Sequence, residues 1–242
     1  MTVRFNFNKT DVKTIPMGMA ENSIDDMYFG CNEKMGHIVN QTYIEKEKQH
    51  FSKEWRECAK YKYKILTNLT SLQMEAICLY TGDNVYLKFN KEVRDRRSNY
   101  DSNSLEFHFH TLHYLLVSAI QILNRNYDCH TVYRRTTLKF AGEVNQVVRF
   151  GSFASSSYRK NLRDFGHESC FEIKTCTGAP LEKLSKFADE AEVLIPPYEM
   201  FKITKIITQS QIEIKGLKDC KIVFFLESAG VQSNLNCKLV HQ

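Results

Sequence analysis

Long apolar runs, low-complexity tracts and internal repeats are all missing from this 242-residue sequence. A helix that crosses a bilayer needs about 20 consecutive apolar residues, and no stretch approaches that length. Charge of one sign is not concentrated anywhere either, because the lysines and arginines are interspersed with acids and the net charge is only +5. Nucleic-acid binding is therefore not indicated, since it usually requires a basic stripe or patch.

Two short motifs are also absent. No Cys-x-x-Cys pair occurs, which disfavours a zinc ribbon. No Gly-x-Gly-x-x-Gly occurs, so the phosphate-binding turn of a Rossmann fold is not predicted.

No Gly/Ser-rich linker divides the chain, and an apolar content of 43% can form a proper core. The length allows one sizeable domain or two small, closely packed ones, and we expect a single domain over residues 1–242.

Cysteine, by contrast, is abundant. The chain has 8 cysteines, and such a high, even number favours disulfides formed in an oxidising compartment. Three Asn-x-Ser/Thr sequons, at Asn8, Asn40 and Asn68, fit passage through the secretory pathway. Neither end shows a signal peptide or an anchor signal, so we expect a mature or trimmed form with an added start methionine.

The N-terminal half is predicted to be helical after a loosely structured start that lasts to about Asp25. Apolar residues repeat at helical spacing over about 45–65 and 104–124. Between these segments, Thr70-Ser71-Leu72-Gln73 is a capping-box pattern at the start of a helix that ends near Gly82.

After Cys129 the chain changes to short runs rich in β-branched and aromatic residues. The predicted strands are 131–137, 146–154, 170–176, 193–195, 199–207, 211–214 and 220–226. Helices over about 20–125 and strands over about 126–237 predict an α+β fold, in which a mostly helical N-terminal part packs on a mainly antiparallel β core.

Glu190 and Glu192 form a Glu-x-Glu pair directly before the apolar run 193–195. In an extended chain both carboxylates point to the same side, and their repulsion would raise one pKa. A fold keeps such a pair where a cation lies between them, for example the oxocarbenium-like transition state of glycosyl transfer. A lone Glu-x-Glu is more often a solvated edge, so the pair indicates chemistry only together with other groups.

Two features of the β half supply such groups. Of the adjacent Arg134 and Arg135, one is expected to point inward, where a guanidinium needs an anion, and the other to face solvent. Ser155 begins a run of serines at the end of a predicted strand, a position that is usually a polar turn. Together, an inward arginine, this serine and the glutamate pair would suit the ribosyl group of a pyridine nucleotide.

A histidine cluster offers a different interpretation. His110 and His113 share a face of the helix predicted over 104–124, close to His108. Two such side chains can begin a metal site, but no third ligand is evident, and we expect no metal.

In chain order, Arg134, Ser155 and Glu190-Ala191-Glu192 resemble the R-S-E-x-E signature of the arginine-specific ADP-ribosyltransferases. The surrounding residues resemble the vertebrate ecto-mono-ADP-ribosyltransferases over about 20–237. The blocks that carry this resemblance are Ile24-Asp25-Asp26-Met27-Tyr28-Phe29-Gly30-Cys31, Tyr80-Thr81-Gly82, Val148-Arg149-Phe150-Gly151, Phe153-Ala154-Ser155-Ser156-Ser157 and Glu192-Val193-Leu194-Ile195-Pro196-Pro197. The resemblance implies an ADP-ribosyltransferase fold with an NAD-binding cleft, and transfer of ADP-ribose from NAD+ to protein arginine with NAD+ glycohydrolase activity on the side.

The resemblance also implies a role for each motif residue. Glu192 should bind the nicotinamide-side ribose and stabilise the oxocarbenium-like centre. Arg134 should hold the pyrophosphate, and Ser155 should support the ribose and Glu192. Glu190 should orient and help deprotonate the acceptor guanidinium, because relatives with Gln there mainly hydrolyse NAD+.

Further residues are assigned in the same way. Tyr133 and Phe153 are expected to contact NAD+. The segment 183–189 is expected to present the acceptor protein, with Phe187 and Asp189 as contacts.

The disulfide pairing that the resemblance implies is Cys31 with Cys237 and Cys129 with Cys176. It gives no partner for four cysteines, which stay open as free thiols, an additional bridge or sites of redox control. These are Cys58, Cys78, Cys170 and Cys220.

Two positions depart from the family pattern. Arg135 stands where a glycine is usual, and a long cation there would crowd the pyrophosphate or add a phosphate contact. Met27 stands where a glutamine is usual, a change that we expect to be structural.

Two other functions stay open: an NAD+ glycohydrolase without transfer, and a catalytically silent extracellular interaction domain. The intact Arg134, Ser155, Glu190 and Glu192 favour the transferase. Its expected partners are NAD+ as substrate and arginine-containing proteins outside the cell or on its surface, without nucleic acid. The expected location is extracellular, secreted or anchored to the cell surface.

Overall fold

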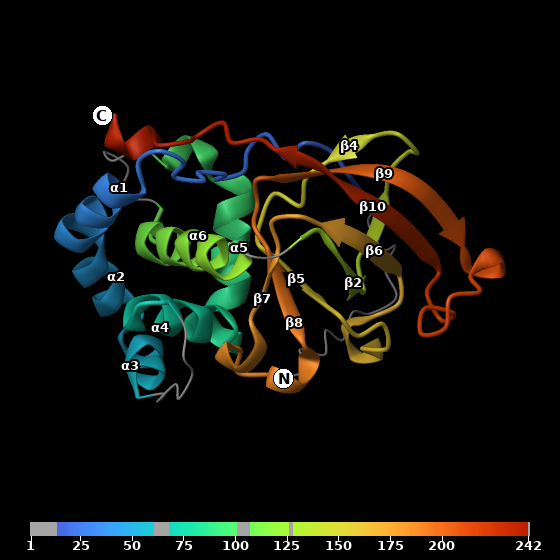
Figure 1. Cartoon of the computed structure of the whole chain (residues 1–242), viewed down its shortest axis with the longest axis horizontal. Coiled ribbons are helices and arrows are strands. Elements are labelled where there is room, and N and C mark those ends of the chain that lie inside the picture. The colour runs from blue at the N-terminus through green and yellow to red at the C-terminus, as the bar shows by residue number, and fades with distance from the viewer. Residues whose placement is uncertain (1–13, 61–67, 101–106, 126–127, 242) are drawn as a thin grey trace.

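The computed structural model describes residues 14–60, 68–100, 107–125 and 128–241. Helices gather on one side of the molecule and strands on the other (Figure 1). Within these residues no helix is both long and apolar enough to cross a membrane.

The helical side consists of α1 (Asn32–Ile38), a π-helical turn (Val39–Tyr43), α2 (Ile44–His50), α3 (Ser52–Ala59), α4 (Ser71–Tyr80), α5 (Asp83–Asp95) and α6 (His110–Asn124). The predicted capping box is present at the start of α4, where the Thr70 hydroxyl accepts from the Gln73 N–H at 3.3 Å and the Gln73 Oε1 accepts from the Thr70 N–H at 2.9 Å. This prediction is confirmed.

Two helix predictions need correction, and one helix was not predicted. The helix expected over 45–65 is interrupted at Phe51, whose φ of −119° and ψ of 42° separate α2 from α3, and its end falls outside the described residues. The helix expected from residue 104 begins at His110, since 107–109 are not helical. The sequence analysis predicts a helix end near Gly82 but not the helix α5 that follows it. Its buried Val85, Phe89 and Val93 recur every four residues, a spacing that would have indicated it.

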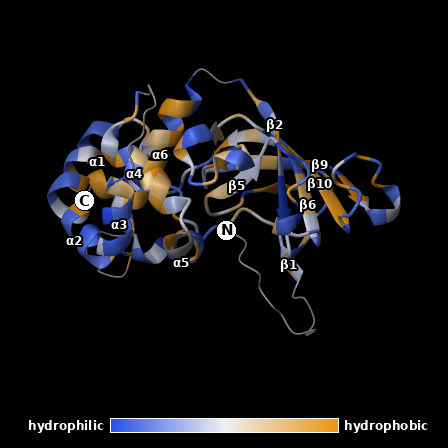
Figure 2. Ribbon diagram, turned by 90° about the horizontal axis from the view of Figure 1, so that it is seen from below, coloured by the Kyte–Doolittle hydropathy of each residue, from blue (hydrophilic) through white to orange (hydrophobic). Residues whose placement is uncertain are grey.

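α6 is the central helix of this side. Leu112, Leu116 and Ile120 are at most 1% exposed, and α6 packs against both α4 and the short strand β7 (Ala179–Pro180). Apolar residues line much of its length (Figure 2). Burial of each large apolar side chain contributes about 1.5–3 kcal/mol to stability. The buried stripe of α6 therefore holds the helical layer against the sheet.

The strands form one eight-stranded sheet in the order β4-β9-β10-β6-β2-β5-β8-β7. Their bounds are β2 (His130–Thr136), β4 (Val147–Val148), β5 (Ala154–Ser157), β6 (Ser169–Thr175), β7 (Ala179–Pro180), β8 (Glu192–Ile195), β9 (Glu199–Thr208) and β10 (Ile222–Val231). All neighbours are antiparallel except β10 and β6. A small parallel pair joins β1 (Thr14–Pro16) to β3 (Lys139–Ala141). The predicted α+β fold with a mainly antiparallel core is confirmed.

The strand predicted over 146–154 is in fact two strands far apart in the sheet. β4 pairs with β9 at one edge, whereas β5 lies between β2 and β8. Gly151 makes the turn between them with φ of 70°, and a Cβ there would lie 2.4 Å from the Cβ of Ala20. The strand predicted over 211–214 is wrong, because Gln211 ends a 3₁₀ turn (Gln209–Gln211) and residues 212–214 form no strand.

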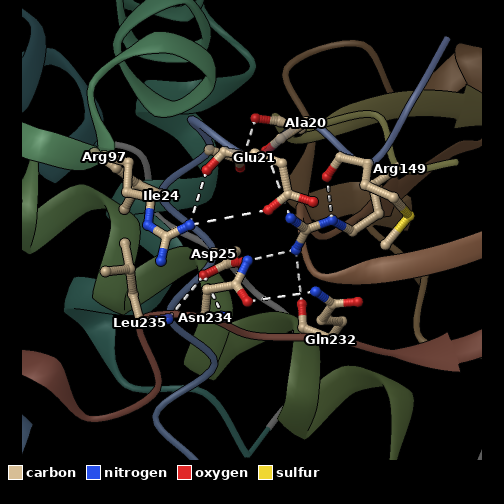
Figure 3. Close-up of polar contacts among 12 residues, drawn as sticks. Ala20, Glu21, Ile24, Asp25, Arg97, Arg149, Gln232, Asn234 and Leu235 are labelled. Atoms are coloured by element: carbon tan, nitrogen blue, oxygen red, sulfur yellow. Dashed lines mark hydrogen bonds and ion pairs between the residues drawn. The ribbon is translucent and has the colours of Figure 1, made fainter.

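A buried ion pair joins both ends of the described chain to the sheet (Figure 3). The Arg149 Nη1 donates to the Asp25 Oδ2 at 2.6 Å, and neither side chain is exposed. The same guanidinium donates to the carbonyls of Met19 and Gln232 at 2.7 and 2.8 Å. The other Asp25 oxygen accepts from the Leu235 N–H at 3.0 Å. Loss of one partner from such a pair costs about 3–5 kcal/mol, so Arg149 is central to this junction.

All eight cysteines are paired. The bridges Cys31–Cys237 and Cys129–Cys176 are the two that the resemblance implies. The bridges Cys58–Cys78 and Cys170–Cys220 account for the four cysteines left open by the sequence.

Candidate active site

A cavity of about 520 Å³ opens between the sheet and the α4–α5 junction. It is lined by residues 80–82, 86–87, 133–138, 155–157, 159, 162, 164–165, 187, 190 and 192. Arg134, Ser155, Glu190 and Glu192 all line it. The structure therefore brings the four motif residues into one space.

The order of three strands explains this arrangement. β2, β5 and β8 are neighbours, so that Tyr133 pairs with Ser157 and Ser157 with Glu192. The Arg134 Nη1 donates to the Ser155 carbonyl at 2.5 Å. The arginine is thereby held across β5, and its guanidinium stays at the cavity wall.

Glu192, the first residue of β8, is a buried carboxylate with its own donor. The Ser185 hydroxyl donates to its Oε2 at 2.9 Å. Burial raises the pKa of Glu192 most strongly, hydrogen bonds from Ser155 and Ser185 lower it, the charge of Glu190 raises it, and Arg134 lowers it. The net pKa lies above the ordinary 4.5. The repulsion from Glu190 that the sequence predicts does raise the pKa of Glu192, but burial raises it more.

Glu190 reaches the cavity by a different route from the one predicted. The backbone is not extended there: Ala188–Glu190 is a 3₁₀ turn, and Ala191 is left-handed with φ of 47° and ψ of 49°. A left-handed non-glycine residue costs roughly 1–2 kcal/mol. The Ser157 hydroxyl donates to the Glu190 carbonyl at 2.5 Å and supports this kink. Burial raises the pKa of Glu190 as well.

Three further polar groups around the motif residues were not singled out from the sequence. The buried Tyr80 hydroxyl lies 3.4 Å from the Ser155 Oγ and accepts from the Asn90 amide at 3.2 Å. Ser185 and Ser157 hold Glu192 and Glu190 as described. Tyr80 and Ser157 stand in blocks that carry the resemblance, whereas nothing in the sequence singles out Ser185.

The other expected ligand contacts divide into two groups. Tyr133 and Phe187 line the cavity. Phe153 lies instead in the core, only 1% exposed, with its ring 5.4 Å from those of Phe89 and His113. Asp189 is exposed outside the cavity lining, and its carbonyl accepts from the Arg159 Nη1 at 2.6 Å. The structure thus gives Phe153 a packing role.

The expectation that one of the paired arginines faces solvent is wrong. Arg134 is half-buried, and Arg135 is only 6% exposed, in an ion pair of 2.7 Å with Asp219. Since neighbouring residues of a strand point to opposite faces, each arginine has its own set of acceptors.

The histidine cluster has structural roles. His113 is buried, with Nδ1 2.7 Å from the Tyr28 hydroxyl and Nε2 3.1 Å from the Ile24 carbonyl. Burial lowers the pKa of both His110 and His113 to about 3. Among the residues that the structure describes, no three His, Cys, Asp or Glu side chains are grouped so that they could hold a metal ion.

Solved structures of one class of enzyme share this fold. A variant of the eukaryotic mono-ADP-ribosyltransferase ART2.2 in complex with NADH is 31% identical, with a TM-score of 0.76 over 92% of this chain and 98% of that one. Another ART2.2 variant, in complex with NAD, is 30% identical with a TM-score of 0.73. Fold and cavity therefore define the class as ADP-ribosyltransferase.

The chain belongs to the NAD:arginine ADP-ribosyltransferase family, whose model matches residues 17–221. It is 32% identical to NAD(P)(+)--arginine ADP-ribosyltransferase 2 of Gallus gallus over 94% of this chain and 74% of the relative. It is 34% identical to T-cell ecto-ADP-ribosyltransferase 2 of Mus musculus over 91% and 76%. Family membership makes it an NAD-using enzyme.

Proposed function

We propose that this protein transfers ADP-ribose from NAD+ to arginine side chains of extracellular or cell-surface proteins. The observation that carries the proposal is the convergence of Arg134, Ser155, Glu190 and Glu192 on one cavity. We infer that residues 1–242 act as a single catalytic domain. The proposal divides the reaction between the two glutamates.

In the first step, the bond between the ribose and nicotinamide breaks, and its electron pair leaves with the nicotinamide. The positive charge that develops on the ribose needs a nearby anion. Glu192 can supply it, because its carboxylate is fixed by Ser185 and buried where water does not screen it. Glu192 therefore lowers the barrier to bond cleavage for every acceptor.

In the second step, a guanidinium nitrogen of the acceptor forms a bond to the ribose carbon and loses a proton. Glu190 is suited to orient this cation and take up the proton, since it lines the cavity and its raised pKa improves it as a base. Water needs less orientation than a guanidinium. Glu190 should therefore matter more for transfer than for hydrolysis.

Arg134 and Ser155 prepare the site for NAD+. Arg134 is a fixed cation at the cavity wall, and a guanidinium is well suited to a pyrophosphate. Ser155 lies between the Tyr80 hydroxyl and Glu192, where its hydrogen bond lowers the pKa of that carboxyl. Tyr133 and Phe187 are proposed as an aromatic contact of NAD+ and of the acceptor protein respectively.

An extracellular location is supported by two observations. All eight cysteines form disulfides, which persist in oxidising compartments. Relatives from Mus musculus and Homo sapiens are named ecto-ADP-ribosyltransferases. Acceptors at the cell surface would be within reach of such an enzyme.

The proposal is tested by incubating the purified protein with labelled NAD+ and agmatine, a small arginine mimic. An ADP-ribosyl-agmatine adduct is expected, together with a smaller amount of free ADP-ribose. Free ADP-ribose without adduct would replace the proposal with NAD+ glycohydrolysis, and no turnover would favour a silent interaction domain.

A further inference from the structure

Arg135 is the most completely bonded side chain near the cavity. A guanidinium has five N–H donors, and each of them has an acceptor here. The acceptors are the carbonyls of Lys160 (3.0 Å), Gly166 (3.0 Å) and Gly216 (2.7 Å) and both Asp219 carboxylate oxygens (3.0 and 2.7 Å). No donor is left for a phosphate, so Arg135 cannot act as a second pyrophosphate ligand without losing one of these bonds.

These acceptors belong to two separate segments. Lys160 and Gly166 are the ends of the segment 160–166, which contains a 3₁₀ turn (Arg163–Phe165). Its residues Leu162, Asp164 and Phe165 line the cavity. The segment has no strand of its own, so the two carbonyl bonds to Arg135 fix a cavity wall at both ends.

Gly216 and Asp219 lie in the second segment, the loop before β10. The disulfide Cys170–Cys220 ties this loop to β6, where Cys170 is the direct cross-strand partner of Arg135. The carboxylate thus approaches Arg135 from a fixed position. The Arg135 guanidinium holds the pKa of Asp219 below its ordinary value, so the pair stays ionised at neutral pH.

Two glycines show how closely the segments meet. Gly216 has φ of +95°, and a Cβ there would lie 2.9 Å from the Cβ of Lys160. Gly166 has φ of +115°, and its Cβ would lie 2.5 Å from the backbone of Thr136 in β2. Each glycine permits a contact that a side chain would block. The wall 160–166 is therefore packed between β2 and the loop of Asp219, with Arg135 at the centre.

We propose that Arg135, held by Asp219, is a positioning residue that fixes the wall 160–166 and so sets the affinity of the cavity for NAD+. It acts through the wall and does not touch the reacting atoms. This inference about Arg135 rests on the proposed function, because it takes NAD+ as the ligand of the cavity. Loosening the wall should weaken NAD+ binding, whereas Glu190 and Glu192 keep their own supports and the chemical step is preserved.

Steady-state kinetics with agmatine separate this role from a merely structural one. Arg135→Lys keeps one charge but loses the planar fork, and Asp219→Asn keeps Arg135 but removes its ionic partner. Each variant should raise the KM for NAD+ about tenfold while kcat changes less than about twofold. Arg97→Gln is the matched control, because Arg97 pairs with Glu21 at 4.0 Å outside the cavity lining.

Limited digestion with trypsin reports how readily the wall 160–166 opens, and it does not depend on catalytic activity. Arg159, Lys160 and Arg163 supply cleavage sites in or beside it, and cleavage there should be at least about fivefold faster in the Arg135→Lys and Asp219→Asn proteins at temperatures well below unfolding. Arg97→Gln should leave the rate unchanged. If Arg135→Lys does not fold, the milder Asp219→Asn carries both measurements, since the Asp219 side chain is one-third exposed.

A lower melting temperature with unaltered KM and unaltered cleavage would overturn the proposal, and so would faster cleavage with unaltered KM. If the wild-type protein shows no turnover, the proposed function fails. The effect of the wall on NAD+ affinity can still be tested by measuring the binding of labelled NAD+ in equilibrium dialysis. In that case an unchanged Kd in both variants refutes the role of Arg135, and a Kd raised about tenfold supports it.

Discussion

The two carboxylates of the site share one property, a pKa raised by burial. Glu192 is buried more deeply and is held by hydroxyl donors, whereas Glu190 is half-buried beside Arg159. Both must be ionised to stabilise a developing cation or to accept a proton. The site thus holds bases that are stronger than exposed glutamates.

This predicts the acid side of the pH profile. Because the pKa of Glu192 lies above 4.5, activity should fall as pH drops through a value higher than that of an ordinary glutamate. Free ADP-ribose formation, which depends on Glu192, is measured as kcat/KM against pH. An acid limb at or below pH 4.5 would contradict the burial of Glu192 in the free enzyme.

At the residue scale, the sequence was sufficient to predict which side chains meet but not how they are held. Arg134, Ser155, Glu190 and Glu192 were found from the motif, and all four line the cavity. The left-handed Ala191 was not predicted, because alanine rarely adopts that conformation. The burial of Arg135 depends on Asp219, and no local pattern connects residues so far apart.

At the scale of elements, α6 depends on a cap from another helix. Its own N-cap residue, Phe109, makes no side-chain cap. Instead Glu47 of α2 accepts from the backbone N–H of Thr111 at 2.5 Å and of Leu112 at 3.2 Å. Burial raises the pKa of Glu47 to about 8, although these two backbone bonds lower it.

Stability should therefore depend on pH through Glu47. A carboxyl whose pKa rises from 4.5 to about 8 on folding binds a proton more tightly in the folded state. Its contribution is complete below pH 4.5 and is lost as pH rises toward about 8. The free energy of unfolding in urea, measured at pH 5 and pH 8, should fall less in Glu47→Gln than in the wild type.

Two variants complete this test. Glu47→Ala should be about 1–3 kcal/mol less stable than Glu47→Gln at pH 5, because it leaves two buried N–H groups without an acceptor. Glu45→Gln, an exposed position of the same helix, should keep the wild-type pH slope. Equal pH slopes in Glu47→Gln and the wild type would exclude Glu47 as the group that titrates.

The element predictions failed where a distant contact overrides local pattern. Residues 146–154 look like one strand, but the Arg149–Asp25 pair and the turn at Gly151 direct its two halves to different parts of the sheet. The capping box of α4 was predictable because all its partners lie within four residues. The cap of α6 was not, since Glu47 is distant in sequence.

At the scale of the whole molecule, the disulfides close loops of very different size. Cys31–Cys237 joins residues 206 apart and Cys58–Cys78 joins residues 20 apart. Longer loops lose more entropy in the unfolded chain, so the first bridge should contribute about 5 kcal/mol and the second about 3 kcal/mol. The Cys31→Ala/Cys237→Ala protein should thus unfold at lower temperature than Cys58→Ala/Cys78→Ala. The reverse order in calorimetry would show that native-state effects outweigh loop entropy.

The central claim is that Glu190 directs ADP-ribose to arginine while Glu192 drives cleavage of NAD+. The most direct measurement is the ratio of ADP-ribosyl-agmatine to free ADP-ribose formed by the wild type, Glu190→Gln, Glu192→Gln and the exposed control Glu182→Gln. Glu192→Gln should lose both products, Glu190→Gln should lose mainly the adduct, by about 100-fold or more, and Glu182→Gln should match the wild type. Equal loss of adduct and free ADP-ribose in Glu190→Gln would contradict this division of roles.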